Sequence, residues 1–163
     1  MSKKANICAV EIHARSGADH VPYLRQQLQK VLELSNTPLQ ELSVVLVGDA
    51  RMSKLHDEFF GDPETTDVIT FPLELDSSGR ASSGELYICV PTARRQAKIH
   101  AVEVRDELLL YVIHGVLHLD GHDDTTTAGY KRMHKIEDEI LMRLGVGAVF
   151  ASADAGARKS GRR

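Results

Sequence analysis

Two histidines near the C-terminal end of the chain have a spacing typical of metal sites. His114 and His118 lie four residues apart in the run HGVLHLDGHDD. Residues four apart share one face of a helix, so both imidazoles can reach a single ion. In a chain with eight histidines, such a pair is weak evidence by itself. The residues after the pair make the evidence stronger.

A glycine after the pair predicts how a third ligand reaches the same point. Gly121 can adopt positive φ, end the helix and turn the chain back. Asp124 can then return to the face of the two histidines as the third ligand. His122 is the alternative, but it lies one residue past Gly121, where the chain has barely reversed. We therefore favour Asp124, and we expect Asp123 to cap or orient a neighbouring group.

This donor set predicts a catalytic zinc ion. Two imidazoles and one carboxylate suit one Zn²⁺ per chain, with water in the fourth position. Such a water has a pKa lowered toward neutrality and can serve as a nucleophile. The alternative is a pair of core histidines bonded to backbone carbonyls, but one ion satisfies both rings at once. The sequence therefore predicts a metal-dependent hydrolase.

The pair lies in the most apolar helix that the sequence predicts. Residues 102–119 form a helix whose second half is so apolar that it must be central to the core. Glu107 and Tyr111 share the helical face of the histidines, so they either support the ligands from behind or simply pack. A final helix over residues 127–144 carries an apolar stripe and ends at Gly145.

The other elements precede residue 102. Apolar patterning predicts four strands there, over residues 7–12, 42–47, 68–73 and 85–90. It also predicts three helices, over residues 19–35, 49–59 and 91–98. Asp19 and Asp49 are expected to be N-caps, and Pro72 confines its strand to an edge or a ladder gap. This order predicts a single α+β domain over residues 1–150, in which a mixed sheet of about four strands packs with about five helices.

Charge and composition narrow the function classes. The net charge is −3, and the last twelve residues carry +3, so a polyanion must be met by a local patch. Arg94, Arg95 and Lys98 either form such a phosphate-facing patch or a solvated helix face. Residues 151–163 are expected to be a disordered basic tail.

Cellular location is predicted from the cysteines and the apolar runs. Cys8 and Cys89 lie within apolar runs and are expected to be buried thiols rather than a disulfide. The start of the chain lacks the apolar core of a secretory signal. The longest apolar run, residues 108–113, is far too short to cross a bilayer. We therefore expect a cytoplasmic protein with no membrane partner.

The histidine spacing also matches the metzincin proteases, with one difference. Those enzymes place a glutamate directly after the first histidine as the general base, whereas this chain has Gly115. Ordinary peptidase chemistry is therefore poorly supported.

Three blocks of the chain resemble the YbeY family of endoribonucleases. The run HGVLHLDGHDD resembles the family pattern HGxLHLxGxDH. Upstream, LHDEFFGDPETTDVITFP resembles LNxxYRxxxxPTDVLSFP, and GELYIC resembles the family's LGDIxIC segment. The blocks keep their order and spacing across residues 55–124.

The resemblance implies a function and a ligand set. It implies zinc at His114, His118 and the third-ligand position, Asp124. It also implies single-strand-specific RNA cleavage in 16S rRNA maturation and ribosome quality control, with RNA and the ribosome or its small subunit as partners and no DNA. Thr66 and Asp67 begin the part resembling TDVLSFP, so they either line the cleft or cap a strand.

Two departures from the family pattern bear on activity. The third histidine is replaced by Asp124, which keeps coordination feasible. The family's arginine falls on Phe60, and loss of one charge-stabilising contact can cost about 10²–10³ in rate. Arg51, Arg94 or Arg95 are the candidates to replace it in space. The alternative function is therefore a ribosome-associated zinc protein that cleaves weakly or not at all.

Overall fold

One mixed sheet organises the chain in the computed structural model, which describes residues 7–150. Its order is β1-β2-β4-β3, and β1, β2 and β4 run parallel while β3 is antiparallel to β4. The strands are β1 (Ala9–Ala14), β2 (Glu41–Val47), β3 (Val68–Leu75) and β4 (Ala81–Cys89). As predicted, Pro72 lies in an edge strand, and the ladder register shifts after it.

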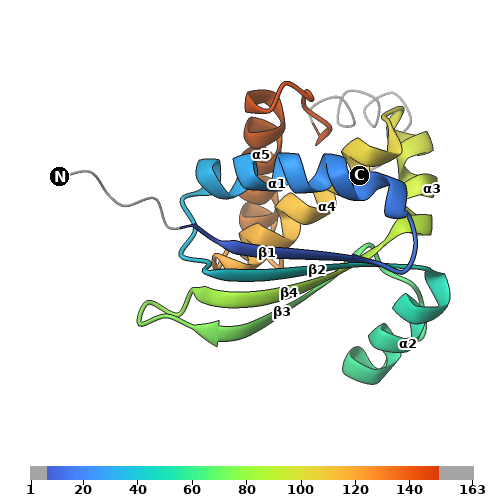
Figure 1. Cartoon of the computed structure of the whole chain (residues 1–163), viewed down its shortest axis with the longest axis horizontal. Helices are drawn as coiled ribbons and strands as arrows, with labels where there is room; N and C mark the ends of the chain where they lie inside the picture. The colour runs from blue at the N-terminus through green and yellow to red at the C-terminus, as the bar shows by residue number, and fades with distance from the viewer. Residues whose placement is uncertain (1–6, 151–163) are drawn as a thin grey trace.

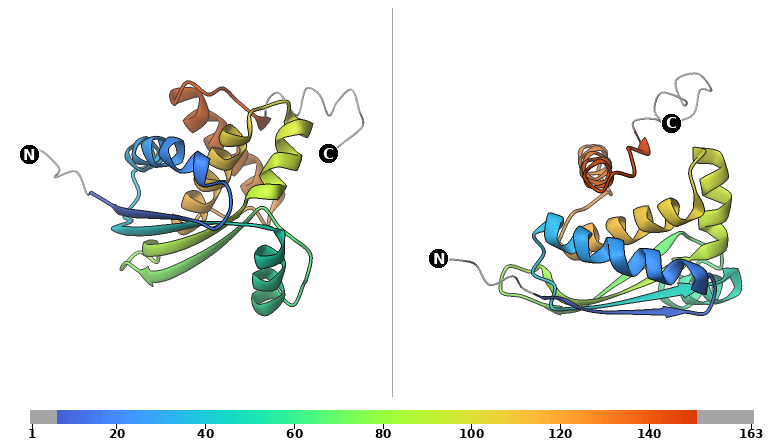
Figure 2. Two further views of the ribbon diagram at one scale, coloured as in Figure 1. Left: turned by 45° about the vertical axis from the view of Figure 1, so that its right-hand side comes forward. Right: turned by 45° about the horizontal axis from the view of Figure 1, so that its top comes forward.

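Within residues 7–150, five α-helices flank the sheet, so the predicted α+β fold is confirmed. They are α1 (Val21–Ser35), α2 (Asp49–Phe60), α3 (Val90–His100), α4 (Val104–Leu119) and α5 (Thr127–Arg143). Helices α1 and α4 cover one face of the sheet, with α5 stacked beyond α4, while α2 lies on the opposite face (Figures 1 and 2). The tail predicted for residues 151–163 lies outside the described residues.

The main core lies between the sheet and α4. Alternate residues of β2 and β4, such as Val44 and Leu86, point toward this helix and are fully buried. Gly115 brings the helix close, because a Cβ at that position would lie 2.6 Å from Leu86 Cδ2. The contact holds the histidine-bearing segment firmly on the sheet.

A smaller cluster joins α2 to the other face. Met52 and Leu55 pack there against Val47, Ile69 and Cys89. Because α2 is short and sits at one end, it leaves the rest of this face without a covering helix among residues 7–150 (Figure 1).

The two predicted N-caps were wrong. Asp19 lies in a short 3₁₀ helix (Ala18–His20), and the N-cap of α1 is His20. Asp49 is the first residue of α2, whose N-cap is Gly48, and the Asp49 carboxylate accepts two hydrogen bonds from Arg95.

Neither a disulfide nor a membrane-spanning helix occurs among residues 7–150. Cys8 and Cys89 are free and buried, as predicted, and burial raises the pKa of both thiols. None of the helices in residues 7–150 combines the length and apolar content that a bilayer span requires.

Candidate metal centre

The C-terminal end of α4 turns the chain back toward the histidines. The Gly121 N–H bonds to the His118 carbonyl and the His122 N–H to the Leu117 carbonyl, each at 3.0 Å. This pair of bonds is a Schellman motif, which needs a residue in the left-handed conformation just past the helix end. Gly121 supplies it with φ 94°, as the sequence predicted. The reversal carries the next loop past the histidine face.

Three donor atoms converge after this turn. His114 Nε2 lies 3.0 Å from His118 Nε2, and the Asp124 Oδ2 atom lies 3.5 Å from each of them. A tetrahedral ion with ligands at about 2.0–2.2 Å has adjacent ligand atoms about 3.4 Å apart. The three side chains therefore form a group that could hold a metal ion. His122 is exposed and does not belong to this group.

A buried carboxylate fixes the orientation of His114. His114 Nδ1 donates a hydrogen bond of 2.9 Å to Oε1 of Glu137, a residue of α5 whose side chain is 1% exposed. Because Nδ1 carries the proton, the lone pair of the neutral ring is on Nε2, toward the other two donors. A carboxylate behind a histidine is a common support of metal ligands, and it raises their basicity.

Charge around this pair keeps the carboxylate ionised. Burial alone would raise the pKa of Glu137, but the hydrogen bond from His114 and the nearby His134 hold it below its ordinary value. Burial disfavours the His114 imidazolium, yet Glu137, Asp67 and Asp124 outweigh it and raise the pKa of His114. The carboxylates that favour the charged ring would also favour a cation at this place.

The loop that carries Asp124 is held from both ends. Asp123 accepts hydrogen bonds from the backbone N–H and the hydroxyl of Thr125, at 2.9 and 2.7 Å, so it orients the loop as expected. The Thr126 hydroxyl caps α5 by accepting from the Gly129 N–H. A Cβ on Gly129 would collide with the Asp123 carbonyl oxygen, so the loop rests directly on the first turn of α5.

The two residues that could have supported the ligands lie nearby, but Glu107 pairs with His100 instead. Glu107 and Tyr111 are buried on the face of α4 that holds His114. Glu107 accepts a hydrogen bond from His100 Nδ1 at 3.0 Å. Neither residue has a hydrogen bond to a candidate ligand among residues 7–150. The position behind His114 belongs instead to Glu137, which the sequence reasoning missed.

Two hollows, each about 470 Å³, meet at His114. One is lined by Thr66, Asp67, Tyr111 and Asp124, among others, so the predicted cleft residues of the TDV segment do lie beside the ligands. Asp67 also accepts the Val68 N–H at 2.8 Å, which caps the start of β3. Both roles considered for this residue are compatible with its position.

The predicted basic patch lies elsewhere. Arg94 and Lys98 are exposed on α3, and Arg95 is engaged by Asp49 at 2.9 and 3.1 Å. The hollow is lined instead by Thr92 and Gln96, on another side of this helix. The patch is not brought to the candidate ligands.

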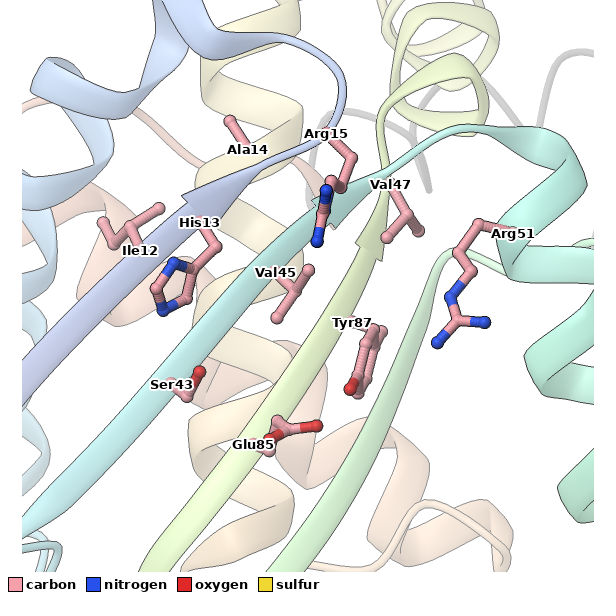
Figure 3. A pocket seen from close by; sticks show the side chains of 10 residues that line it. All are labelled: Ile12, His13, Ala14, Arg15, Ser43, Val45, Val47, Arg51, Glu85 and Tyr87. Atoms are coloured by element: carbon pink, nitrogen blue, oxygen red, sulfur yellow. The ribbon is translucent and has the colours of Figure 1, made fainter.

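Arg51 lines a third hollow, of about 940 Å³, on the open face of the sheet (Figure 3). Arg15, Tyr87 and Glu85 share this hollow, which contains none of the three candidate ligands. The second hollow at His114 is the one that contains Phe60. Phe60, on which the family's arginine would fall, thus lines the same hollow as His114 and His118. No lysine or arginine of residues 7–150 lines either of the two hollows at His114.

Fold and site together define a single-sheet α+β protein with a His₂Asp group that could hold a metal ion at the end of a core helix. Residues 10–145 match the sequence profile of the family described as Endoribonuclease YbeY. The chain therefore belongs to the YbeY family, as the sequence blocks predicted.

Individual relatives agree with this assignment. The chain is 32% identical to the endoribonuclease YbeY of Thermus thermophilus over 123 residues, which are 74% of this chain and 88% of the relative. It is 37% identical to that of Bordetella avium over 114 residues, 70% of each. A Thermotoga maritima protein solved in solution shares the fold, with a TM-score of 0.58 at 24% identity over 85% of this chain and 91% of that one.

Two residues of the site were not predicted, although the sequence contains an indication of each. Glu137 lies between Met133 and Ile140 in the inward stripe of α5, where a lone carboxylate needs a buried partner. Gly129 lies in the first turn of the same helix, where glycine is unfavourable unless another chain segment approaches. Neither indication identifies the residue that Glu137 or Gly129 contacts.

Proposed function

We propose that this chain is a zinc-dependent endoribonuclease that cuts single-stranded RNA in the cytoplasm, acting on 16S rRNA in maturation and in ribosome quality control. The observation that carries the proposal is the convergence of His114, His118 and Asp124 in a member of the YbeY family. The relatives' name, endoribonuclease, supports RNA as the substrate.

The donor set fits zinc better than a hard cation. Mg²⁺ and Ca²⁺ prefer cages of oxygen ligands, whereas two of these three donors are imidazole nitrogens. Bound there, zinc would supply a Lewis acid and a water molecule of lowered pKa. Glu137 holds His114 with its Nε2 toward the site, and the loop supported by Gly129 presents the carboxylate of Asp124. Three protein ligands leave a position open to the substrate.

Cleavage by purified protein tests this function. Zinc-loaded wild type should cut single-stranded RNA, and His118→Ala should abolish cutting. His100→Ala is the matched control, because its ring bonds to a buried glutamate but lies outside the candidate metal group. Cutting that survives both chelation and His118→Ala would contradict the proposal.

A second candidate function is a ribosome-associated zinc protein that binds RNA but cleaves it poorly. It is favoured by Phe60, which faces the ligands where the family has arginine. A large gain in cleavage by Phe60→Arg would favour this candidate, whereas unchanged cleavage would show that another group stabilises the charge.

Peptidase chemistry is the interpretation that the site supports least. Gly115 provides no general base, and its position is packed against Leu86, so the helix has no room there for a glutamate. Proteolysis of a general protein substrate by zinc-loaded protein would revive it.

A further inference from the structure

Phe60 is a large apolar residue exposed beside the candidate ligands. It is the last residue of α2, and it is 61% exposed. The His56 ring, one turn earlier, lies 5.4 Å from it between centroids, with the planes tilted by 47°. Single exposed apolar residues are common on proteins, so exposure alone carries little. The position of this one is informative.

The two rings line the same hollow as the two histidines of the candidate metal group. The hollow is about 470 Å³ and also borders Thr70, His114 and His118. An occupant of this space that rests on Phe60 therefore lies beside His114 and His118, two of the three candidate ligands. For a substrate cut at the metal, this is the place of a neighbouring part of the same molecule.

Among residues 7–150, the hollow has no permanently cationic side chain to pair with phosphate. No lysine or arginine of the described residues lines it or the hollow on the other side of His114, and the whole chain carries −3. In the metal-free protein, affinity for a nucleic acid in this hollow therefore has to come from contacts other than ion pairs with lysine or arginine. Stacking of bases on aromatic rings is such a contact, and it requires bases freed from a duplex.

We propose that Phe60, together with His56, forms a stacking platform for one nucleobase of single-stranded RNA next to the bond that is cut. The proposal rests on the proposed nuclease function and adds a residue that positions the substrate. A base stacked on Phe60 presents its edge to the tilted His56 ring.

The hydrogen bonds of His56 suit this role. Its Nδ1 donates to the Glu64 carbonyl at 2.7 Å, which fixes the ring and leaves Nε2 of the neutral imidazole as an acceptor. An exocyclic amino group of the base is a suitable donor to it. Purines present the larger face, so they should bind here better than pyrimidines.

The adjacent residue provides a matched control. Phe59 is 58% exposed on the same helix, but its ring packs against Phe71 at 4.8 Å and does not line the hollow at the ligands. We would compare wild type, Phe60→Ala, Phe60→Trp and Phe59→Ala. Chelated, metal-free protein would be titrated with single-stranded RNA that carries 2-aminopurine, whose fluorescence is quenched by stacking.

Phe60→Ala should weaken RNA binding about 5- to 150-fold, since stacking contributes about 1–3 kcal/mol per base and 1.4 kcal/mol is tenfold. It should also relieve the quenching, whereas Phe60→Trp and Phe59→Ala should behave as wild type, with thermal unfolding verifying that all are folded. Equal binding by wild type and Phe60→Ala, or an equal loss in Phe59→Ala, would overturn the platform.

Cleavage by the zinc-loaded proteins separates this inference from the function on which it rests. Wild type that cuts RNA, together with Phe60→Ala that binds as tightly, refutes the platform and leaves the nuclease standing. Wild type that binds RNA through Phe60 but never cuts it refutes the nuclease and leaves only the stacking of a base on Phe60 standing.

Discussion

His114 and His100 are held in nearly the same way, yet they belong to different kinds of site. Each donates from Nδ1 to a buried glutamate, at 2.9 Å to Glu137 and at 3.0 Å to Glu107. The two imidazoles are 19% and 20% exposed, and each glutamate is 1% exposed. In both cases the carboxylate contributes to a raised pKa of the histidine.

The difference lies at the second ring nitrogen. His114 Nε2 faces His118 and Asp124 at 3.0 and 3.5 Å, whereas His100 belongs to no metal-binding group within residues 7–150. A histidine backed by a buried carboxylate is therefore equally suited to structural pairing and to metal binding. The additional donors decide which of the two it does, and the helix end at Gly121 supplies one of them.

The largest expected effect is the difference in RNA cleavage between His114→Ala and His100→Ala. His114→Ala should lower RNA cleavage about a thousandfold or more, because a metal contributes several kcal/mol to stabilising transition-state charge. His100→Ala should keep most of the cleavage per folded molecule. Initial rates at saturating zinc measure both. Comparable losses in the two variants would remove the distinction between the sites.

Replacing each of the two glutamates by glutamine should affect the zinc affinity of the protein differently. Glu137→Gln should weaken zinc binding about 10- to 100-fold, the usual effect of losing a residue that supports a metal ligand. Glu107→Gln should change it little. Competition with a chromophoric chelator reports both affinities, and a weakening by Glu107→Gln as large as that by Glu137→Gln would contradict the assignment.

The loop contact should matter less than the ligands and their support. Gly129→Ala should weaken zinc binding about tenfold, at the low end of such effects, because the new Cβ displaces the Asp123 carbonyl and the loop that presents Asp124. Gly48→Ala is the control, since a Cβ there meets nothing within 4 Å. Competition with the same chelator measures the zinc affinity of both variants. Equal affinities would argue that the contact at Gly129 does not position the loop that carries Asp124.

The structural pair should contribute a small, pH-dependent stability. The hydrogen bond to Glu107 raises the pKa of His100 above 6.5, although burial opposes it. This stabilisation is fully present below about pH 6.5 and is lost as pH rises through the raised value. The unfolding free energies of metal-free wild type and His100→Gln should therefore differ by about 1 kcal/mol more at about pH 6 than at about pH 9. Urea unfolding measures this, and a constant difference would refute the linkage.

The features of the site that the sequence predicted depend on local rules. The four-residue spacing of His114 and His118 and the positive φ of Gly121 require only a single helix and its end. The position of Asp124 is set by the same turn. The α+β class could be predicted from the order of apolar patterns, because alternation and helical periodicity are properties of short segments.

The features that the sequence did not predict depend on distant segments. Glu137 is 23 residues from His114 and reaches it only because α5 crosses α4. Phe60 lines a hollow with His114 and His118 because α2, β3 and α4 border the same space. Asp19 failed as a cap because a short 3₁₀ helix intervenes before α1. Such placements require the packed structure.

Metal content by elemental analysis tests the central claim most directly, in wild type, Asp124→Ala and His122→Ala purified in parallel. Wild type and His122→Ala should each carry about one zinc per chain, and Asp124→Ala should carry far less, because its remaining donors are only two imidazoles. Full zinc in Asp124→Ala together with loss in His122→Ala would contradict the ligand set.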